Sequence, residues 1–123
     1  MTTMKSHKAR GAGYEIDITK WFRTRGYDAE RLARRGSKDE GDVVIRSDFL
    51  GANIGILECK APGANGKITL SGWTKEAQTE AGNYAEARGL DRRTLLAGVV
   101  IKARGKSIED SYLVLRLGDV FGG

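Results

Sequence analysis

The sharpest pattern of apolar and polar positions in the chain is a short apolar stretch that ends in charged residues. Residues 54–60 have the sequence Ile-Gly-Ile-Leu-Glu-Cys-Lys and lie between two glycine-containing turns, which predicts a buried β-strand. Because side chains alternate across a strand, Glu58 and Lys60 share one face with the isoleucines, and Cys59 points to the other face. A carboxylate and an ammonium therefore emerge side by side from an apolar element.

Similar patterns predict the other elements. In order they are a loose basic tail at 1–9, a helix over 11–25, an extended edge strand over 27–34 and a strand over 42–46. After the strand 54–60 they are a mobile loop at 61–67, a helix from Ser71 or Thr74 to Arg88, and strands over 94–101 and 111–117. Residues 29–33 would also suit a helix, and residues 118–123 are too few to add much.

This order predicts a single α/β domain over residues 1–123, with a mixed β-sheet of about five strands flanked by helices in the order α-β-β-β-α-β-β. The strands 42–46 and 54–60 are expected to form a hairpin. Each helix has an apolar stripe for packing on the sheet and a glycine after its last turn. The stripes are Tyr14, Ile18, Trp21 and Phe22 in the first helix, and Trp73, Ala77, Ala81 and Tyr84 in the second. Glu15 lies at the margin of the first stripe, either as a rim residue or facing a cleft.

The net charge of +5 is concentrated near the N-terminus. Residues 1–35 carry nine Lys and Arg against four Asp and Glu, and the rest of the chain is balanced. A basic face of this kind fits a polyanion such as nucleic acid. No basic amphipathic helix with an exposed apolar face accompanies it, which argues against a membrane surface. No apolar run approaches the roughly 20 residues needed to cross a bilayer.

Cysteine and histidine usage excludes two other kinds of site. Cys59 is the only cysteine and His7 the only histidine, so neither an intramolecular disulfide nor a His/Cys zinc cluster can form. Cys59 is placed in a buried strand and His7 in the polar tail, which argues against a catalytic thiol. The expected location is a reducing cytoplasm, of a prokaryotic cell or of the host cell if the protein is viral.

Four side chains form a candidate metal-dependent site: Glu15, Asp42, Glu58 and Lys60. Asp42 starts one strand and Glu58 closes its neighbour, and paired strands lie about 4.8 Å apart, so both carboxylates can converge on one cation. Mg²⁺ binds carboxylate and phosphate oxygens, and it activates water and neutralises charge on a scissile phosphate. Lys60 would orient or help deprotonate the attacking water, or stabilise developing negative charge. The plainer alternative is a strand that ends in a surface salt bridge.

The order and spacing of these residues resemble the PD-(D/E)xK nuclease superfamily, whose motif corresponds here to Asp42 followed by Glu58-Cys59-Lys60. Within that superfamily, residues 10–15 (Arg-Gly-Ala-Gly-Tyr-Glu) and Gly36-Ser37 are similar to the corresponding segments of archaeal-type Holliday junction resolvases. The resemblance extends over about residues 10–102. It implies a restriction-endonuclease-like sheet.

The resemblance also implies roles for individual residues. The cation, Mg²⁺ or Mn²⁺, would be bound by Glu15, Asp42, Glu58 and the backbone carbonyl of Cys59. Lys60 would be catalytic. The residues expected to contact DNA are Arg10, Arg31, Arg34, Arg35, Ser37 and Lys38. Gln78 is a further candidate, since some superfamily members have a glutamine in this helix.

Two features depart from the resolvase pattern. The spacing from Ser37 to Asp42 is longer, and Gly41 stands where the superfamily motif has a proline. Both suit a divergent, phage-type member. The family's dimer surface is not carried over to this chain.

The leading hypothesis is a structure-selective endonuclease that resolves four-way DNA junctions by paired nicks. It would work as a homodimer, because symmetric nicking requires two sites and one domain supplies one. No helix-turn-helix or zinc finger is visible, which favours recognition of DNA shape. A general repair or restriction-type endonuclease on the same fold is the first alternative, and a catalytically inactive DNA-binding module is the second.

Overall fold

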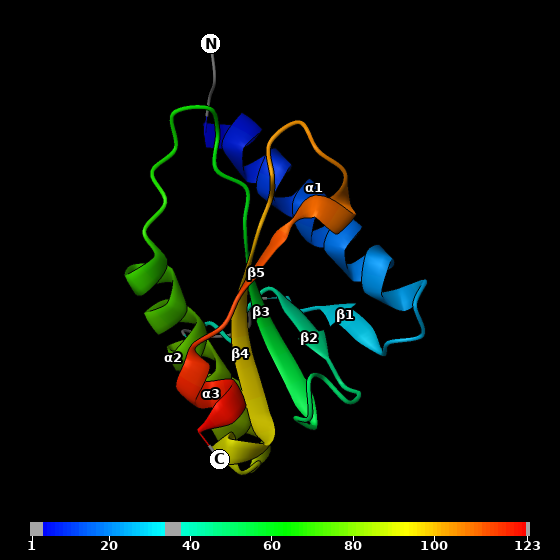
Figure 1. The fold of residues 1–123 in the computed structure, drawn as a ribbon, viewed down its shortest axis with the longest axis vertical. Coiled ribbons are helices and arrows are strands. Elements are labelled where there is room, and N and C mark those ends of the chain that lie inside the picture. Colours follow the sequence, from blue (N-terminus) through cyan, green and yellow to red (C-terminus); the bar gives the residue numbers. More distant parts are fainter. Residues whose placement is uncertain (1–3, 34–37, 123) are drawn as a thin grey trace.

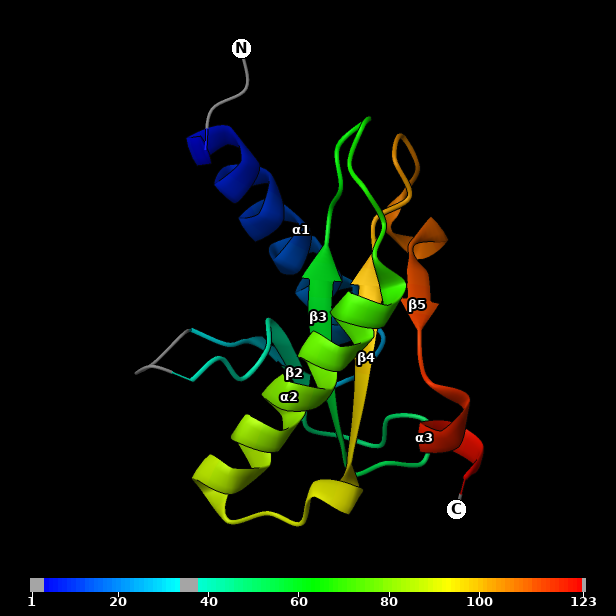
Figure 2. The same cartoon turned by 90° about the vertical axis from the view of Figure 1, so that its left-hand side faces the viewer.

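The computed structural model describes residues 4–33 and 38–122 and shows a mixed β-sheet with a long helix on each face (Figures 1 and 2). The strands are β1 (Ala29–Arg31), β2 (Val43–Ile45), β3 (Ile54–Lys60), β4 (Leu95–Ile101) and β5 (Tyr112–Val114). The helices are α1 (Met4–Arg23), α2 (Leu70–Arg88) and α3 (Leu117–Phe121), with short 3₁₀ turns at Arg92–Thr94 and Ile108–Asp110. The predicted five-stranded sheet and the order α-β-β-β-α-β-β are confirmed, and α3 is an addition to that order.

Strand β3 lies at the centre of the sheet, whose strand order is β1-β2-β3-β4-β5. Its bounds agree with the prediction, and its antiparallel pairing with β2 confirms the hairpin. β3 and β4 are parallel, and α2 forms the crossover that parallel neighbours require. The carboxyl ends of β3 and β4 therefore lie side by side, at the same end of the sheet. The loop from β3 to α2 extends beyond that end (Figure 2).

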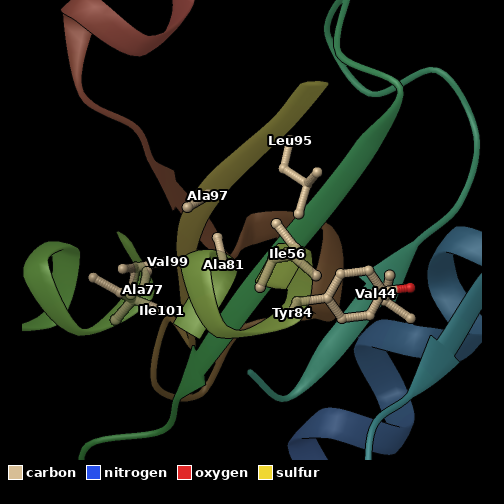
Figure 3. Packing of buried hydrophobic residues seen from close by; sticks show 10 residues of the cluster. Val44, Ile56, Ala77, Ala81, Tyr84, Leu95, Ala97, Val99 and Ile101 are labelled. Atoms are coloured by element: carbon tan, nitrogen blue, oxygen red, sulfur yellow. The ribbon is translucent and has the colours of Figure 1, made fainter. Parts of the chain in front are cut away.

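Alternation along the strands divides the core into two layers. The layer on the α2 side includes Val44, Ile56, Ala77, Ala81 and Tyr84 (Figure 3). The layer on the α1 side includes Tyr14, Ile18, Val43, Leu57 and Val100. The predicted helix stripes lie in these layers, except for Trp21, which lines an apolar surface groove beside Phe22. Glu58 shares the face of Ile56, so its side chain lies on the α2 side of the sheet.

The N-terminal elements differ from the prediction in their ends. α1 begins at Met4, so the predicted loose tail is helical from that residue on. Methionine, lysine, alanine and arginine are good helix formers, so this basic segment can continue the helix toward the N-terminus. β1 is a short edge strand, and residues 34–37, which include the end of the predicted strand, lie outside the described part of the chain.

Two later elements also differ in their ends. α2 begins at Leu70, and the hydroxyl of Thr74 donates to the Leu70 carbonyl at 2.8 Å instead of capping the helix. Its predicted end is confirmed, because Gly89 takes up the left-handed conformation that follows many helices. β5 ends at Val114 rather than at residue 117, since the next residues turn into α3. Within residues 4–33 and 38–122, no helix combines the length and the apolar content that a bilayer span requires.

Gly41 has a backbone conformation that explains why proline is absent from this position. Its φ is +104°, whereas the proline ring holds φ near −65°. The N–H of Gly41 also donates to Asp39 Oδ1 at 2.9 Å, a bond that proline cannot make. A Cβ atom on Gly41 would lie 2.7 Å from Cγ2 of Ile56. Glycine is therefore required for the chain to enter β2 with Asp42 beside β3.

The substitution Gly41→Ala is expected to lower the free energy of unfolding by roughly 1–3 kcal/mol, because it combines positive-φ strain with a clash in the core. Urea denaturation followed by circular dichroism measures this change. Gly82→Ala in α2 is the matched control, since its added methyl group meets no atom within 4 Å. The control is expected to be neutral or to stabilise by up to about 1 kcal/mol. Equal stability of the two variants would contradict the strain assigned to Gly41.

Candidate active site

The pairing of β2 with β3 places two carboxylates next to each other. Val43 lies opposite Leu57, and the same register continued by one residue sets Asp42 opposite Glu58. The backbone N–H of Asp42 donates to the Leu57 carbonyl at 3.1 Å. Oδ2 of Asp42 accepts a hydrogen bond of 2.8 Å from the backbone N–H of Cys59. Asp42 is thus fixed at the carboxyl end of β3, where like charges on opposite residues are destabilising unless compensated.

Helix α2 adds two glutamates that the sequence analysis missed. Glu76 and Glu80 are four residues apart, on the side of the helix whose alanines Ala77 and Ala81 pack on the sheet. One carboxylate oxygen each from Glu58, Glu76 and Glu80 lies within 4.8 Å of the others, and we call these three residues the acidic cluster. Their i, i+4 spacing beside an apolar stripe was the available signal. Only the packing of α2 on β3 shows that they meet Glu58.

Burial makes the charged forms of these groups unfavourable. Glu58 is 7% exposed and Glu80 only 3%. Burial, together with the neighbouring carboxyl groups of Glu80 and Asp42, raises the pKa of Glu58 far above its ordinary value. Burial is also the main cause that raises the pKa of Glu80 to about 7. The pKa of Asp42 is raised mainly by burial as well, although its bond from Cys59 N–H opposes the shift.

Lys60 lies beside the acidic cluster. Its Nζ is 2.8 Å from Oε1 of Glu76 and 3.6 Å from Oε1 of Glu58, and it lies 5.6 Å from the ring centroid of Trp73. Partial burial opposes the charged amine, but hydrogen bonding to Glu76 and the charge of Glu58 outweigh it and raise the pKa of Lys60. Lys60 is therefore an ammonium at neutral pH. That state favours stabilisation of negative charge over deprotonation of water.

Glu15 reaches the site from the other face of the sheet. It lies on α1, and its Oε1 is 3.5 Å from the guanidinium of Arg31. Burial, and next the charge of Asp42, raise the pKa of Glu15, so the two carboxylates are close enough to interact. Among the described residues, Glu15 is not part of the group that includes Glu58, because α1 and α2 cover opposite faces. A cation shared by Glu15, Asp42 and Glu58 remains a prediction.

The remaining predicted site residues have the following places. Arg31 pairs with Glu15, and Lys38 is exposed with its Nζ 3.5 Å from Oε1 of Glu86. Arg34, Arg35 and Ser37 lie outside the described residues, as does the side chain of Arg10. DNA contacts by these residues therefore stay predictions.

Gln78 and Cys59 have surroundings that limit their roles. The amide nitrogen of Gln78 donates to Oδ2 of Asp119 at 2.7 Å, and its oxygen accepts from Arg92 at 2.6 Å. These bonds tie Gln78 to α3 rather than to the acidic cluster. Burial raises the pKa of the Cys59 thiol, which fits the prediction that Cys59 is not a nucleophile. A metal contact by its carbonyl is untested.

The donor set fits a hard divalent cation. Oε2 of Glu58 and both carboxylate oxygens of Glu80 are buried and have no hydrogen-bond partner among the described residues. Carboxylate oxygens are the ligands that Mg²⁺ and Mn²⁺ prefer. Asp42 and the acidic cluster together offer several such oxygens around one strand end. The arrangement can hold a cation beside the ammonium of Lys60.

The mixed five-stranded sheet, whose central strand ends in Glu-Cys-Lys opposite an aspartate, is similar in fold to a solved structure. The solved structure of Hjc from Archaeoglobus fulgidus, a Holliday junction resolvase from an archaeal hyperthermophile, matches this chain with a TM-score of 0.55 at 17% identity. The match covers 85% of this chain and 76% of that chain. No family model and no curated protein matches the sequence. The structural match confirms the predicted resolvase-like fold.

The metal-free protein is expected to lose stability as the pH rises from about 5 to about 8. The folded protein raises the pKa of Glu80 from 4.5 to about 7, so the stabilising contribution of its protonated form is complete below pH 4.5 and is lost as the pH passes through about 7. The expected loss is roughly 1–3 kcal/mol, measured by urea denaturation in EDTA at several pH values.

The variant Glu80→Gln cannot ionise and should show a flatter dependence of stability on pH over the same range. Asp48→Asn is the matched control, since Asp48 is exposed and lies in the turn before β3. Its pH dependence should follow that of the unmodified protein. A pH profile of Glu80→Gln that coincides with both would show that Glu80 titrates normally in the folded state.

Proposed function

We propose that this protein is a metal-dependent endonuclease that hydrolyses phosphodiester bonds in branched DNA, and that it resolves four-way junctions by paired nicks. The observation that carries the proposal is the placement of Asp42 opposite Glu58, with the ammonium of Lys60 beside them, at the carboxyl end of the central strand of a resolvase-like sheet. A surface salt bridge does not account for this arrangement, because Glu58 is buried and several further carboxylates surround it.

The residues of this chain would divide the work as follows. Asp42 and Glu58 would bind Mg²⁺ or Mn²⁺, with Glu15 and the carbonyl of Cys59 as further ligands. The cation supplies an activated water and neutralises charge on the scissile phosphate. Lys60, held as an ammonium, would stabilise the negative charge that develops on the phosphate oxygens.

A basic surface would bind the DNA backbone. The excess of positive charge lies in residues 1–35, in α1 and at the adjacent Arg34 and Arg35. The proposed phosphate contacts are Arg10, Arg31, Arg34, Arg35, Ser37 and Lys38. Because these contacts follow the backbone, affinity would depend on DNA shape and on salt rather than on base sequence.

The active form would be a homodimer, because two symmetric nicks require two sites. Support comes from large apolar side chains that remain exposed in the last two elements, Tyr112 and Leu113 in β5 and Leu117 and Phe121 in α3. A second copy of the chain that covered these side chains would remove apolar surface from water. The competing proposals are a general repair or restriction-type endonuclease, and an inactive DNA-binding module.

Purified protein with Mg²⁺ is expected to introduce paired symmetric nicks in a labelled four-way junction and to leave a matching linear duplex largely intact. Glu58→Gln and Lys60→Ala should each lower the cleavage rate by at least about 100-fold, since each removes a group that acts on the reacting phosphate. Junction binding, measured by gel shift in EDTA, should change little.

Two variants serve as controls for these substitutions. Asp48→Asn and Arg93→Gln remove exposed charges near the amino ends of β3 and β4, at the opposite end of the sheet from the site. Both variant proteins should cleave the junction normally. Equal cutting of junction and duplex would favour the general endonuclease. Binding with no cutting in Mg²⁺ or Mn²⁺ would favour the inactive module, and unfolding of Glu58→Gln would favour a structural role for Glu58.

Junction affinity in EDTA is expected to fall steeply with salt, as a linear plot of log affinity against log salt concentration. Arg35→Ala and Lys38→Ala should each reduce the magnitude of that slope by about 1, because each removes one phosphate contact. The side chain of Arg93 is exposed near the amino end of β4, away from the proposed DNA surface. Arg93→Gln should therefore leave the slope unchanged. The proposed DNA surface is wrong if Arg35→Ala and Lys38→Ala both keep the slope of the unmodified protein.

A further inference from the structure

Glu80 has surroundings that the nuclease residues proposed above do not explain. It lies on the packed side of α2 beside Ala81, is 3% exposed, and has no hydrogen-bond partner for either carboxylate oxygen among the described residues. Oε2 of Glu58, which belongs to the same acidic cluster, is also buried without a partner. Burying a carboxylate without a partner costs several kcal/mol, so a positive ion or a proton must compensate it.

Lys60 does not supply that compensation. Its ammonium reaches Glu76 at 2.8 Å and Glu58 at 3.6 Å, but within the described residues no Lys or Arg nitrogen lies within 4.0 Å of Glu80. One ammonium therefore faces the three carboxylates of the acidic cluster, and Asp42 adds a fourth acidic group beside Glu58. The cluster is deficient in positive charge on the side of α2.

The spacing of the acidic cluster suits a cation. Its three oxygens lie within 4.8 Å of one another, and opposite ligands of a cation with bonds of 2.0–2.1 Å are about 4.2 Å apart. Small side-chain rotations therefore bring the oxygens into ligand range. Glu76 has 47% of its side chain exposed. Glu76 and Glu80 line a surface hollow together with Asp39, Lys75, Thr79 and Asn83. An ion has access from solvent.

We propose that Glu58, Glu76 and Glu80 form a divalent-cation site for Mg²⁺ or Mn²⁺ on the α2 face, next to the site of Asp42 and sharing Glu58 with it. Two cations linked by one carboxylate would place positive charge on both sides of a phosphate. A catalytic role for the second cation rests on the proposed nuclease function. Cation binding at the acidic cluster is independent of that function and is measured without DNA.

The test is titration of the full chain with Mn²⁺ in the absence of DNA, with bound and free Mn²⁺ distinguished by electron paramagnetic resonance. The unmodified protein is expected to bind two ions. Glu80→Gln and Glu76→Gln should each lose one of them or weaken it at least tenfold, whereas Asp42→Asn should weaken the other. Asp48→Asn, an exposed acidic residue outside the cluster, should bind like the unmodified protein. Circular dichroism verifies that each variant is folded, and glutamine preserves the volume of the buried glutamate.

Lys60→Ala is expected to change Mn²⁺ affinity in the opposite direction from Glu76→Gln and Glu80→Gln. The ammonium of Lys60 competes with a cation for Glu76 and Glu58, so its removal should tighten Mn²⁺ binding at the acidic cluster while lowering the cleavage rate. A merely structural role for Glu76 and Glu80 would not produce tighter binding in this variant.

The outcomes separate this inference from the proposed function. Loss of one Mn²⁺ in Glu80→Gln without cleavage activity in the unmodified protein supports the cation site and overturns the nuclease. Junction cleavage with unchanged Mn²⁺ binding in Glu80→Gln overturns the cation site, shows that a proton compensates Glu80, and leaves the nuclease standing. Absence of Mn²⁺ binding to the unmodified protein also overturns the inference.

Discussion

The structure depends on one constraint, the concentration of carboxylates at the end of a buried strand. The register between β2 and β3 brings Asp42 to Glu58, and the packing of α2 adds Glu80 from the same side. Each of these placements costs free energy, because charge is removed from water and like charges approach one another. A fold that keeps such a cluster must offset the cost, through the apolar layers on both faces of the sheet and through a proton or a positive partner for the acids.

The apolar layers explain how the sheet tolerates this arrangement. β3 and β4 pair in parallel along their length and are covered on both faces, so the site is built on largely buried strands. The small alanines of α2 allow close approach to β3, and the same close approach brings Glu80 near Glu58. A larger residue in place of Ala77 or Ala81 would therefore also displace the carboxylate of Glu80 from Glu58.

Periodic patterns made most of the fold predictable. The strand over residues 54–60 was predicted with its observed bounds, because an apolar run between glycine turns has few alternatives. Gly89 ended α2 as expected. The ends without such signals were less predictable. The helix from Met4 has no apolar stripe at its start, and α3 is too short to show a period. Glu15, Asp42, Glu58 and Lys60 were recognisable because they follow a linear motif.

What the sequence by itself determined is the set of elements, their order and the acidic motif, since these follow from local spacing along the chain. What only the tertiary structure decided is which carboxylates meet. Glu15 lies on α1, on the opposite face of the sheet from Glu58, whereas Glu76 and Glu80 approach Glu58 although they follow it by about twenty residues. The physical reason is that the face covered by each helix depends on long-range packing and on the parallel crossover, and neither is encoded in the spacing of charged residues.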